Sequence, residues 1–294
     1  MWFWFAVAAA LLWGGADLFY KLASGRNTEY SHLKIVVAVG VLMGLHAFIH
    51  ISVSGVTYDP LNLIRYFPVS ALYILSMTVG YLGLRYIELS VSSPIGNSSG
   101  AVAFILCFLL LGYETSVLQF IAAGVASAGI LALSVLEKQR HAGRLHKKED
   151  EMYRFGAAAI IFPVLYCVID GLGTFADAVV LSGFMDDEQA LLSYEFTFLT
   201  AAIIAAFYLV FIKKTRVAAL FAKDRAAAGI LETAGQIFYI RAMAENAVLT
   251  APLVACYCVI SVLLSRVFLK EKLSKAQYAV IIAIILAIAV LGVE

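Results

Sequence analysis

The chain has 294 residues, of which 63% are hydrophobic and only 14% are charged, and its formal net charge is +1. A soluble globular domain has about 45–50% apolar and about 25% charged residues, so this composition indicates a protein whose main solvent is lipid. Because the charges almost balance, the chain has no basic stripe that would hold phosphates, and a nucleic-acid partner is excluded.

Ten segments of the chain are apolar and long enough to cross a bilayer, which takes about 20 residues per helix. Lipid cannot satisfy backbone polar groups, so helices are expected, and the short alternating segments of a barrel are missing from the sequence. The first segment carries Asp17 and Lys21 and no basic stretch before them, so it is interpreted as a mature helix and not as a signal peptide. The predicted spans are 2–23, 32–53, 67–87, 92–111, 117–136, 155–180, 191–212, 226–244, 250–269 and 276–293.

Charges in the connecting segments predict how the helices are oriented. Segments 137–154, 213–225 and 270–275 are rich in Lys and Arg, whereas 181–190 carries three acids and no base. Basic loops remain in the cytoplasm, so the pattern predicts a multi-pass protein of the cell (inner or plasma) membrane with both termini outside.

The sequence also repeats itself. Pro94 and Gln119 of the first half recur as Pro252 and Gln277, in both cases 158 residues later, and Asp17 recurs as Asp170 after 153 residues. The predicted halves are 1–136 and 155–294, joined by a basic cytoplasmic linker at 137–154. With five spans each, the second half enters the membrane from the opposite side, which is the inverted repeat of many secondary transporters.

The segment Leu269–Ser274 reads LKEKLS and is followed by Gln277. It resembles the signature of the EamA family in the drug/metabolite transporter superfamily, in which a Glu-containing turn separates the last two helices of each half. Segment Leu111–Ser116, which contains Glu114, with Gln119 is a weaker first copy, and Trp13-Gly14-Gly15 is similar to the family's Trp-Gly opening.

The resemblance implies an all-α integral membrane carrier of ten helices, arranged as two inverted five-helix repeats around a central substrate cavity with alternating access. Relatives include exporters of amino acids and other metabolites. They commonly keep both termini in the cytoplasm, whereas the loop charges of this chain favour termini outside.

Ionisable residues within the spans are costly in lipid and are therefore candidates for function. Asp17 has Trp13 one turn before it, and Asp170 has Tyr166 in the corresponding position. Each half thus offers an aromatic ring and a carboxylate from its first helix. The alternative for Asp17 is a simple ion pair with Lys21, four residues later.

The second half adds acids that the first half lacks. Glu195 lies in the predicted seventh span, and Glu232 lies in the eighth with Gln236 and Tyr239 on the same helical face. These residues predict an asymmetric, negatively charged lining.

Two further candidates come from the paired segments around the prolines. Asn97 belongs to the polar, glycine-rich stretch 92–100, and Tyr257 belongs to the corresponding part of the ninth span. Proline frees a backbone carbonyl that can line a cavity. Tight packing of small residues is the competing interpretation.

The favoured hypothesis is a secondary transporter for a small organic metabolite that bears an amine or another cation. Carboxylates match a cation, and aromatic rings can cover it. Asp17, Asp170 and Glu232 are also the candidates for proton coupling. Export of neutral or zwitterionic amino acids is the alternative, and a lipid flippase is less favoured. The predicted substrate-binding residues are Trp13, Asp17, Asn97, Tyr166, Asp170, Glu195, Glu232, Gln236, Tyr239 and Tyr257.

The sequence predicts neither an enzyme nor a cofactor or metal site. No histidine accompanies a Cys or Ser in a nucleophile–base arrangement, and Cys256-x-Cys258 has the wrong spacing for a metal or redox pair. His46 and His50, one turn apart, are expected to be packed near the interface; a proton relay is the alternative. The expected partners are a small-molecule substrate and the bilayer, and a homodimer is left open.

Overall fold

The computed structural model describes residues 1–24, 29–112, 116–145 and 159–292, with the side chains of 137–145 and of residue 219 left aside, and this part of the chain forms helices and no strands. In chain order these are α1 Trp2–Ala23, α2 Ser31–Ser54, α3 Leu61–Gly83, α4 Leu89–Asn97, α5 Ser99–Leu111, α6 Val117–Leu145, α7 Ile161–Leu181, α8 Asp187–Phe207, the π-helix η3 Tyr208–Ile212, the 3-10 turn η4 Val217–Ala219, α9 Lys223–Ala255, α10 Tyr257–Phe268 and α11 Lys275–Leu291.

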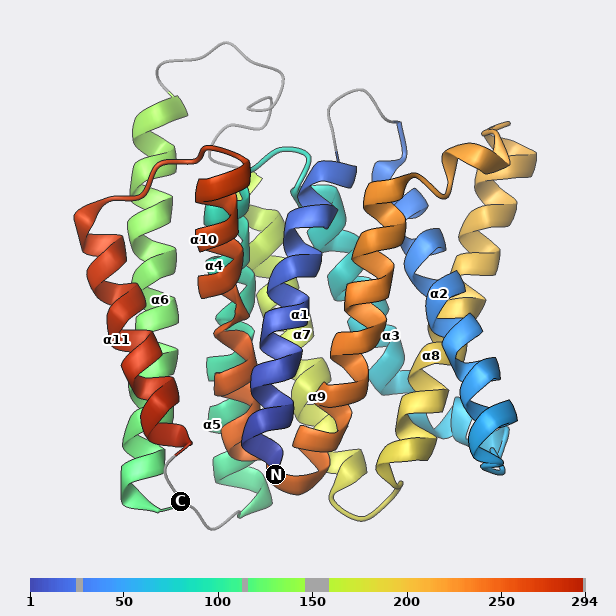
Figure 1. Cartoon of the computed structure of the whole chain (residues 1–294), viewed down its shortest axis with the longest axis horizontal. Helices are drawn as coiled ribbons and strands as arrows, with labels where there is room; N and C mark the ends of the chain where they lie inside the picture. The colour runs from blue at the N-terminus through green and yellow to red at the C-terminus, as the bar shows by residue number, and fades with distance from the viewer. Residues whose placement is uncertain (25–28, 113–115, 146–158, 293–294) are drawn as a thin grey trace.

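Eight helical segments of the described chain are long and apolar enough to cross a membrane. The predicted spans 226–244 and 250–269 fall in one of them, the 46-residue segment Lys223–Phe268. Its backbone leaves helical geometry at Asn246 (φ −157°, ψ 86°), and in Figure 1 the chain descends along α9 to the face that carries the termini and returns along α10. The last predicted span corresponds to α11, which is a shorter apolar helix. The chain is therefore a helical, multi-pass membrane protein.

Some helix ends differ from the predicted spans. Helix α3 begins at Leu61, before the predicted start at 67, and Pro68 lies inside the helix. Helix α6 continues to Leu145, so the first part of the predicted linker 137–154 is helical. Residues 146–154 and the predicted helix start at 155 lie outside the described residues, as does Glu114 of the first Glu-containing turn.

The repeated Ser/Gln pairs begin two helices in the same way. At the start of α11 the Ser274 side chain accepts a hydrogen bond from the Gln277 backbone N–H, and the Gln277 side chain accepts one from the Ser274 N–H. Ser116 and Gln119 make the same two bonds at the start of α6, at 3.2 and 3.4 Å. These capping boxes satisfy backbone donors that a helix start leaves unpaired, which explains why a Ser and a Gln stand three residues apart at both helix starts.

Ser274→Ala should therefore lower the stability of the folded protein by about 1 kcal/mol, the usual cost of losing such a cap. Thermal unfolding of the purified variant in detergent measures this effect. Ser182→Ala is the matched control, because Ser182 donates only to a carbonyl three residues back and its replacement leaves no backbone donor unpaired. Equal melting temperatures for the two variants would contradict the capping role.

Glu271 of the Glu-containing turn has a different task. Its two carboxylate oxygens accept hydrogen bonds from the backbone N–H groups of Leu89 and Ser90, at 3.3 and 3.0 Å. A carboxylate at a helix N-terminus satisfies free donors and complements the helix dipole. Glu271 thus fastens the start of α4 to the loop between α10 and α11.

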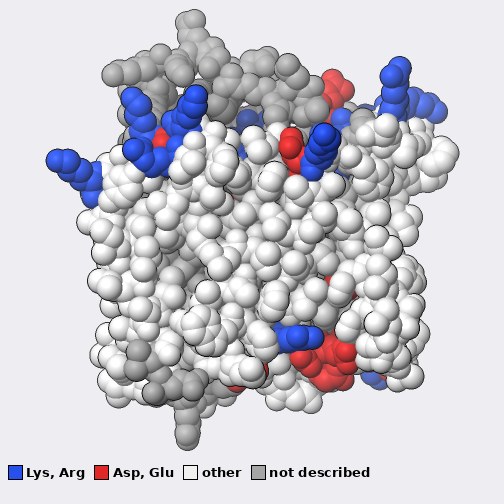
Figure 2. Space-filling view, viewed as in Figure 1, with Lys and Arg blue, Asp and Glu red and all other residues white. Residues whose placement is uncertain are grey.

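Helices that are far apart in sequence pack in pairs. Helix α1 lies against α9, α3 against α7, α2 against α8, α4 against α10 and α6 against α11. In Figure 1 the pairs α6/α11 and α2/α8 form the two edges of the molecule, and both termini lie on its lower face. Figure 2 shows a broad uncharged belt, with Lys and Arg gathered mainly above it and an acidic group below it. Apolar side chains cover the outer faces of the helices, including Phe48 (57% exposed) and Ile64 (73%), as contact with lipid requires.

Candidate functional site

A cavity of ≈ 100 Å³ lies among α1, α3, α4, α7 and α9, and further residues of α5, α8 and α10 complete its wall. This volume is room for several water molecules or a small ligand. The lining includes Leu84 and Leu89, at the ends of α3 and α4. The cavity therefore extends toward the face opposite the termini, where the basic side chains gather (Figure 2).

The structure brings the predicted binding residues together, with one exception. Within the described part of the chain none of the lining side chains is Lys, Arg or His. The predicted residues that line the cavity are Trp13, Asp17, Asn97, Tyr166, Asp170, Glu232, Gln236, Tyr239 and Tyr257.

Asp17 is held by two hydroxyl groups from other helices. Its Oδ2 accepts hydrogen bonds from Ser93 of α4 at 2.6 Å and from Ser261 of α10 at 2.7 Å. Lys21, the ion-pair partner considered from the sequence, instead donates to the carbonyl oxygens of Leu84 and Ile87, at 2.6 and 2.5 Å. The simple Asp17–Lys21 pair is therefore wrong, and Asp17 faces the cavity with hydroxyl partners.

Asp170 is held in a similar way on the other side. Its Oδ2 accepts a hydrogen bond from Ser99 of α5 at 2.7 Å, and its Oδ1 accepts a longer one from Ser76 of α3 at 3.4 Å. The two aspartates, which lie 153 residues apart in the sequence, thus each receive hydrogen bonds from two serine hydroxyl groups. Serines restrain each carboxylate without neutralising its charge.

Glu232 is anchored by an aromatic side chain. Its Oε2 accepts a hydrogen bond from the Tyr20 hydroxyl at 2.9 Å, and its backbone carbonyl accepts one from Trp13 Nε1 at 3.2 Å. On the same face of α9, Gln236 Nε2 is buried and has no hydrogen-bond partner among the residues that the structure describes. Buried polar groups normally have a partner, so this amide nitrogen indicates a ligand position.

Aromatic rings form much of the cavity wall. The Trp13 ring lies 4.9 Å from that of Tyr239 and 6.0 Å from that of Tyr257, measured between centroids. Tyr166 packs against Gly80 and Gly96, where an added Cβ would come within 2.8 and 3.0 Å of its ring. Such a wall binds both apolar groups and cations.

Both prolines of the repeat precede a break in a cavity-lining helix. Pro94 comes four residues before Ser98, where α4 gives way to α5, and Pro252 comes four residues before Cys256, where α9 gives way to α10. Ser98 Oγ donates to the Pro94 carbonyl at 3.0 Å, and Cys256 Sγ contacts the Pro252 carbonyl at 3.1 Å. The proline positions were therefore informative about local backbone structure as well as about repetition.

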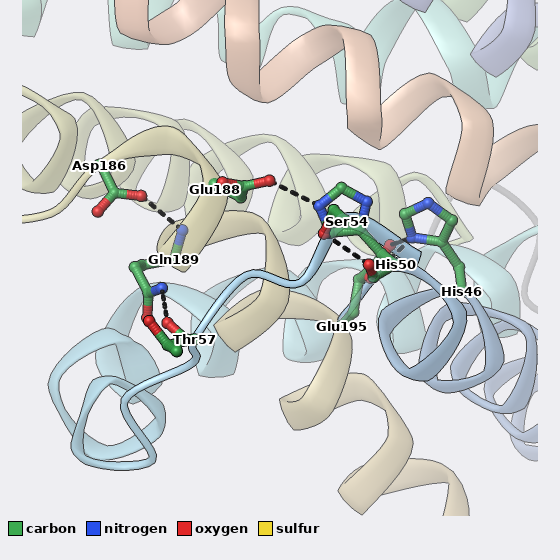
Figure 3. Close-up of polar contacts among 8 residues, drawn as sticks. All are labelled: His46, His50, Ser54, Thr57, Asp186, Glu188, Gln189 and Glu195. Atoms are coloured by element: carbon green, nitrogen blue, oxygen red, sulfur yellow. Dashed lines mark hydrogen bonds and ion pairs between the residues drawn. The ribbon is translucent and has the colours of Figure 1, made fainter. Parts of the chain in front are cut away.

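Glu195 is the predicted binding residue that does not line the cavity. It is fully buried between α8 and α2, where His46 Nδ1 lies 2.7 Å from its Oε1 (Figure 3). One turn along α2, His50 Nε2 lies 2.7 Å from Glu188. Each histidine of α2 thus pairs with a carboxylate of α8. These two pairs explain why the histidines stand one helical turn apart.

Glu195→Gln should consequently leave the affinity of the cavity for its ligand unchanged within about twofold, whereas Glu232→Gln should weaken the binding of a positively charged ligand about tenfold, the value of one charge-assisted hydrogen bond. Titration of each purified variant by ligand-induced thermal stabilisation measures both affinities. A large loss in the Glu195 variant would place Glu195 in the binding path after all.

Sequence reasoning missed several tyrosines of the wall. They are Tyr20 of α1, Tyr73 and Tyr81 of α3, and Tyr194 of α8. The hydroxyl groups of Tyr73 and Tyr239 form a hydrogen bond of 2.8 Å. Tyr66 donates to Asp177, which is fully buried beyond the cavity lining.

Comparisons with known proteins add the fold alone. No family model matches the chain, and no curated protein matches it. Among solved structures 28 chains match. One of them, a protein known from its crystal structure, has a TM-score of 0.67 and 14% sequence identity, and the match covers 98% of this chain and 95% of that one. At 14% sequence identity, this match shows a shared fold and nothing beyond it.

Proposed function

We propose that the chain is a secondary transporter that moves a small amine-bearing or cationic metabolite across the membrane by alternating access. It would be an EamA-like member of the drug/metabolite transporter superfamily, built from ten spans in two inverted repeats. The observation that carries the proposal is a cavity within the membrane-spanning helices that presents Asp17, Asp170 and Glu232 and no basic side chain among its described lining residues.

The helix pairing supports the inverted repeat. A two-fold relation between the halves would exchange α1 with α7 and α3 with the first part of α9, and it would therefore map the α1/α9 contact onto the α3/α7 contact. Both contacts are among the most extensive in the molecule. The break at Asn246 supplies the extra reversal that ten spans require.

The cavity supports a cationic substrate by its charge and its walls. Uncompensated carboxylates in a low-dielectric site attract a cation strongly, and the rings of Trp13, Tyr239 and Tyr257 can cover its face. One of the three acids could exchange a proton for the substrate, which would couple transport to the proton gradient.

Export of a neutral or zwitterionic amino acid is the second candidate. It is favoured by Gln236 Nε2, a buried donor at the cavity that has no partner among the described residues and would suit a substrate carboxylate. Lys21, considered from the sequence for this task, is not among the described lining residues and donates to the backbone carbonyls of Leu84 and Ile87.

Uptake into proteoliposomes tests the proposal. Purified protein would be challenged with radiolabelled primary amines, quaternary ammonium ions and neutral amino acids, with and without an imposed pH gradient. Saturable uptake of cations that protein-free vesicles lack is the expected result. Uptake confined to neutral amino acids would favour the second candidate, and no saturable uptake of either class would overturn both.

A further inference from the structure

A second group of polar side chains lies beyond the cavity, on the side of the termini. We call it the closing layer, and its members are Tyr66, Tyr73, Thr174, Asp177 and Tyr239. Three of them line the cavity, whereas Tyr66 and Asp177 do not. Asp177 lies near the end of α7, which leads in Figure 1 to a loop on the face that carries the termini. Since the cavity extends the other way, the closing layer lies between the cavity and that face.

Hydroxyl groups connect the members of the closing layer. The Tyr73 hydroxyl lies 2.8 Å from that of Tyr239 and donates a hydrogen bond to Thr174 Oγ1 at 3.3 Å. The Tyr66 hydroxyl donates to Asp177 Oδ1 at 2.5 Å. The Tyr239 hydroxyl lies close enough to the Asp177 carboxyl group to interact with it. All three tyrosines are buried, so the layer is closed to water in this form of the protein.

Asp177 lacks a positive partner in the described part of the chain. Its side chain is completely buried, its Oδ2 has no hydrogen-bond partner among the described residues, and none of the ion pairs between them includes it. Helix α4, which also packs on α7, has no titratable side chain. The titratable groups near Asp177 are Tyr66 and Tyr73 of α3, Cys107 of α5, Tyr239 of α9 and, two turns earlier on α7 itself, Asp170.

None of these neighbours is a base, and this decides the state of the Asp177 carboxyl group. An ionised carboxylate that is buried with a single hydrogen bond and no cation is so costly that the group takes up a proton instead. Because Tyr66 donates to Oδ1, the proton belongs on Oδ2. Asp177 is therefore neutral while the closing layer is shut.

The cost of ionising Asp177 changes when the carrier changes its form. To open the cavity toward the termini, the closing layer has to separate, and water then reaches the carboxyl group. A hydrated carboxylate carries no burial cost, so the open form releases the proton to the water on that side. A ligand that binds one form more tightly stabilises that form, and the proton therefore stabilises the closed layer.

We propose that Asp177 is a proton-binding site that controls the opening of the cavity toward the face of the termini. A proton on Oδ2 keeps the closing layer shut, and its loss to water allows the layer to open. The inference rests on the proposed transport and holds for a cationic or a neutral substrate. The site is separate from Asp17, Asp170 and Glu232, so substrate binding and this proton use different acids.

Infrared spectroscopy of the purified protein at neutral pH tests proton binding without any substrate. The spectrum of the wild type minus that of Asp177→Asn should contain the C=O stretch of a protonated carboxyl group. Glu195→Gln is the matched control, because Glu195 is equally buried but lies 2.7 Å from His46 Nδ1 and is expected to be ionised. Its difference spectrum should lack that band. Absence of the band for Asp177→Asn would overturn the inference and leave the proposed transport standing.

Exchange across proteoliposome membranes tests the control of opening. Vesicles loaded with unlabelled tetramethylammonium or alanine would take up the same compound in labelled form, at saturating concentration and over a series of pH values. The maximal rate of the wild type should rise with pH, because ionisation of Asp177 favours opening. Asp177→Asn cannot ionise, so at alkaline pH its maximal rate should be at least about tenfold lower. Its apparent affinity should stay within about twofold of the wild type, since the cavity is unchanged.

Three outcomes would count against the inference. A pH profile of Asp177→Asn that equals that of the wild type, in protein of normal thermal stability, would overturn the control by Asp177. If that variant does not fold, a wild-type maximal rate that is independent of pH would overturn it instead. If the wild type exchanges neither compound, the proposed function fails and the control of opening fails with it, whereas the infrared spectra still decide whether Asp177 holds a proton.

Discussion

Asp170→Asn is expected to reduce the uptake of a cationic substrate at least tenfold. Asparagine has nearly the same shape and can still accept the Ser99 hydrogen bond, so the change removes charge and little else. Losing one charged partner in a buried site is worth about 1.5–3 kcal/mol, which corresponds to a tenfold to hundredfold loss of affinity. The reduction should therefore appear chiefly as a weaker apparent affinity in proteoliposome uptake.

Asp224→Asn is the matched control for that experiment. Asp224 is exposed at the start of α9 and lies outside the cavity lining. Its replacement by Asn changes the net charge by the same amount as Asp170→Asn. Its uptake should equal that of the wild type. Full activity in the Asp170 variant, with protein of normal thermal stability, would contradict the proposed role of the cavity carboxylates.

Gly40→Leu is expected to prevent normal folding. A Cβ at Gly40 would lie 2.2 Å from the Phe198 carbonyl oxygen and 2.7 Å from Ala202 Cβ, so α2 and α8 could not approach as they do. Overpacking commonly costs about 1–3 kcal/mol and sometimes more. Here the obstacle includes a backbone atom that cannot rotate away, which places the variant at the upper end of that range or beyond it. Yield of monodisperse protein and melting temperature measure the effect.

Gly124→Leu provides the comparison within the same fold. Gly124 lies in α6, and an added Cβ would meet nothing within 4 Å. This variant should express and melt like the wild type, since leucine also favours helix more than glycine does. If both variants lost stability equally, the cause would be a general effect of leucine on helix formation or membrane insertion. The close contact between α2 and α8 would then not explain the loss.

The predicted residues that line the cavity share a specific property. Asp17 and Asp170 stand at related positions of a repeat, and Glu232, Gln236 and Tyr239 share one helical face. Such relations follow from chain geometry and predict that side chains point the same way. Glu195 carried no such relation. Its charge alone suggested the cavity, whereas its position on α8 directs it to His46.

The sequence by itself determined that this chain is a membrane protein of helices and which acids lie at membrane depth, because composition and periodicity record the solvent that each face meets. Only the tertiary structure decided which acids share a cavity. Asp17 meets Ser93 and Ser261, and Asp170 meets Ser76 and Ser99, through contacts between helices that are far apart in the chain. A buried carboxylate needs a polar partner, and hydropathy shows that need without showing which helix will meet it.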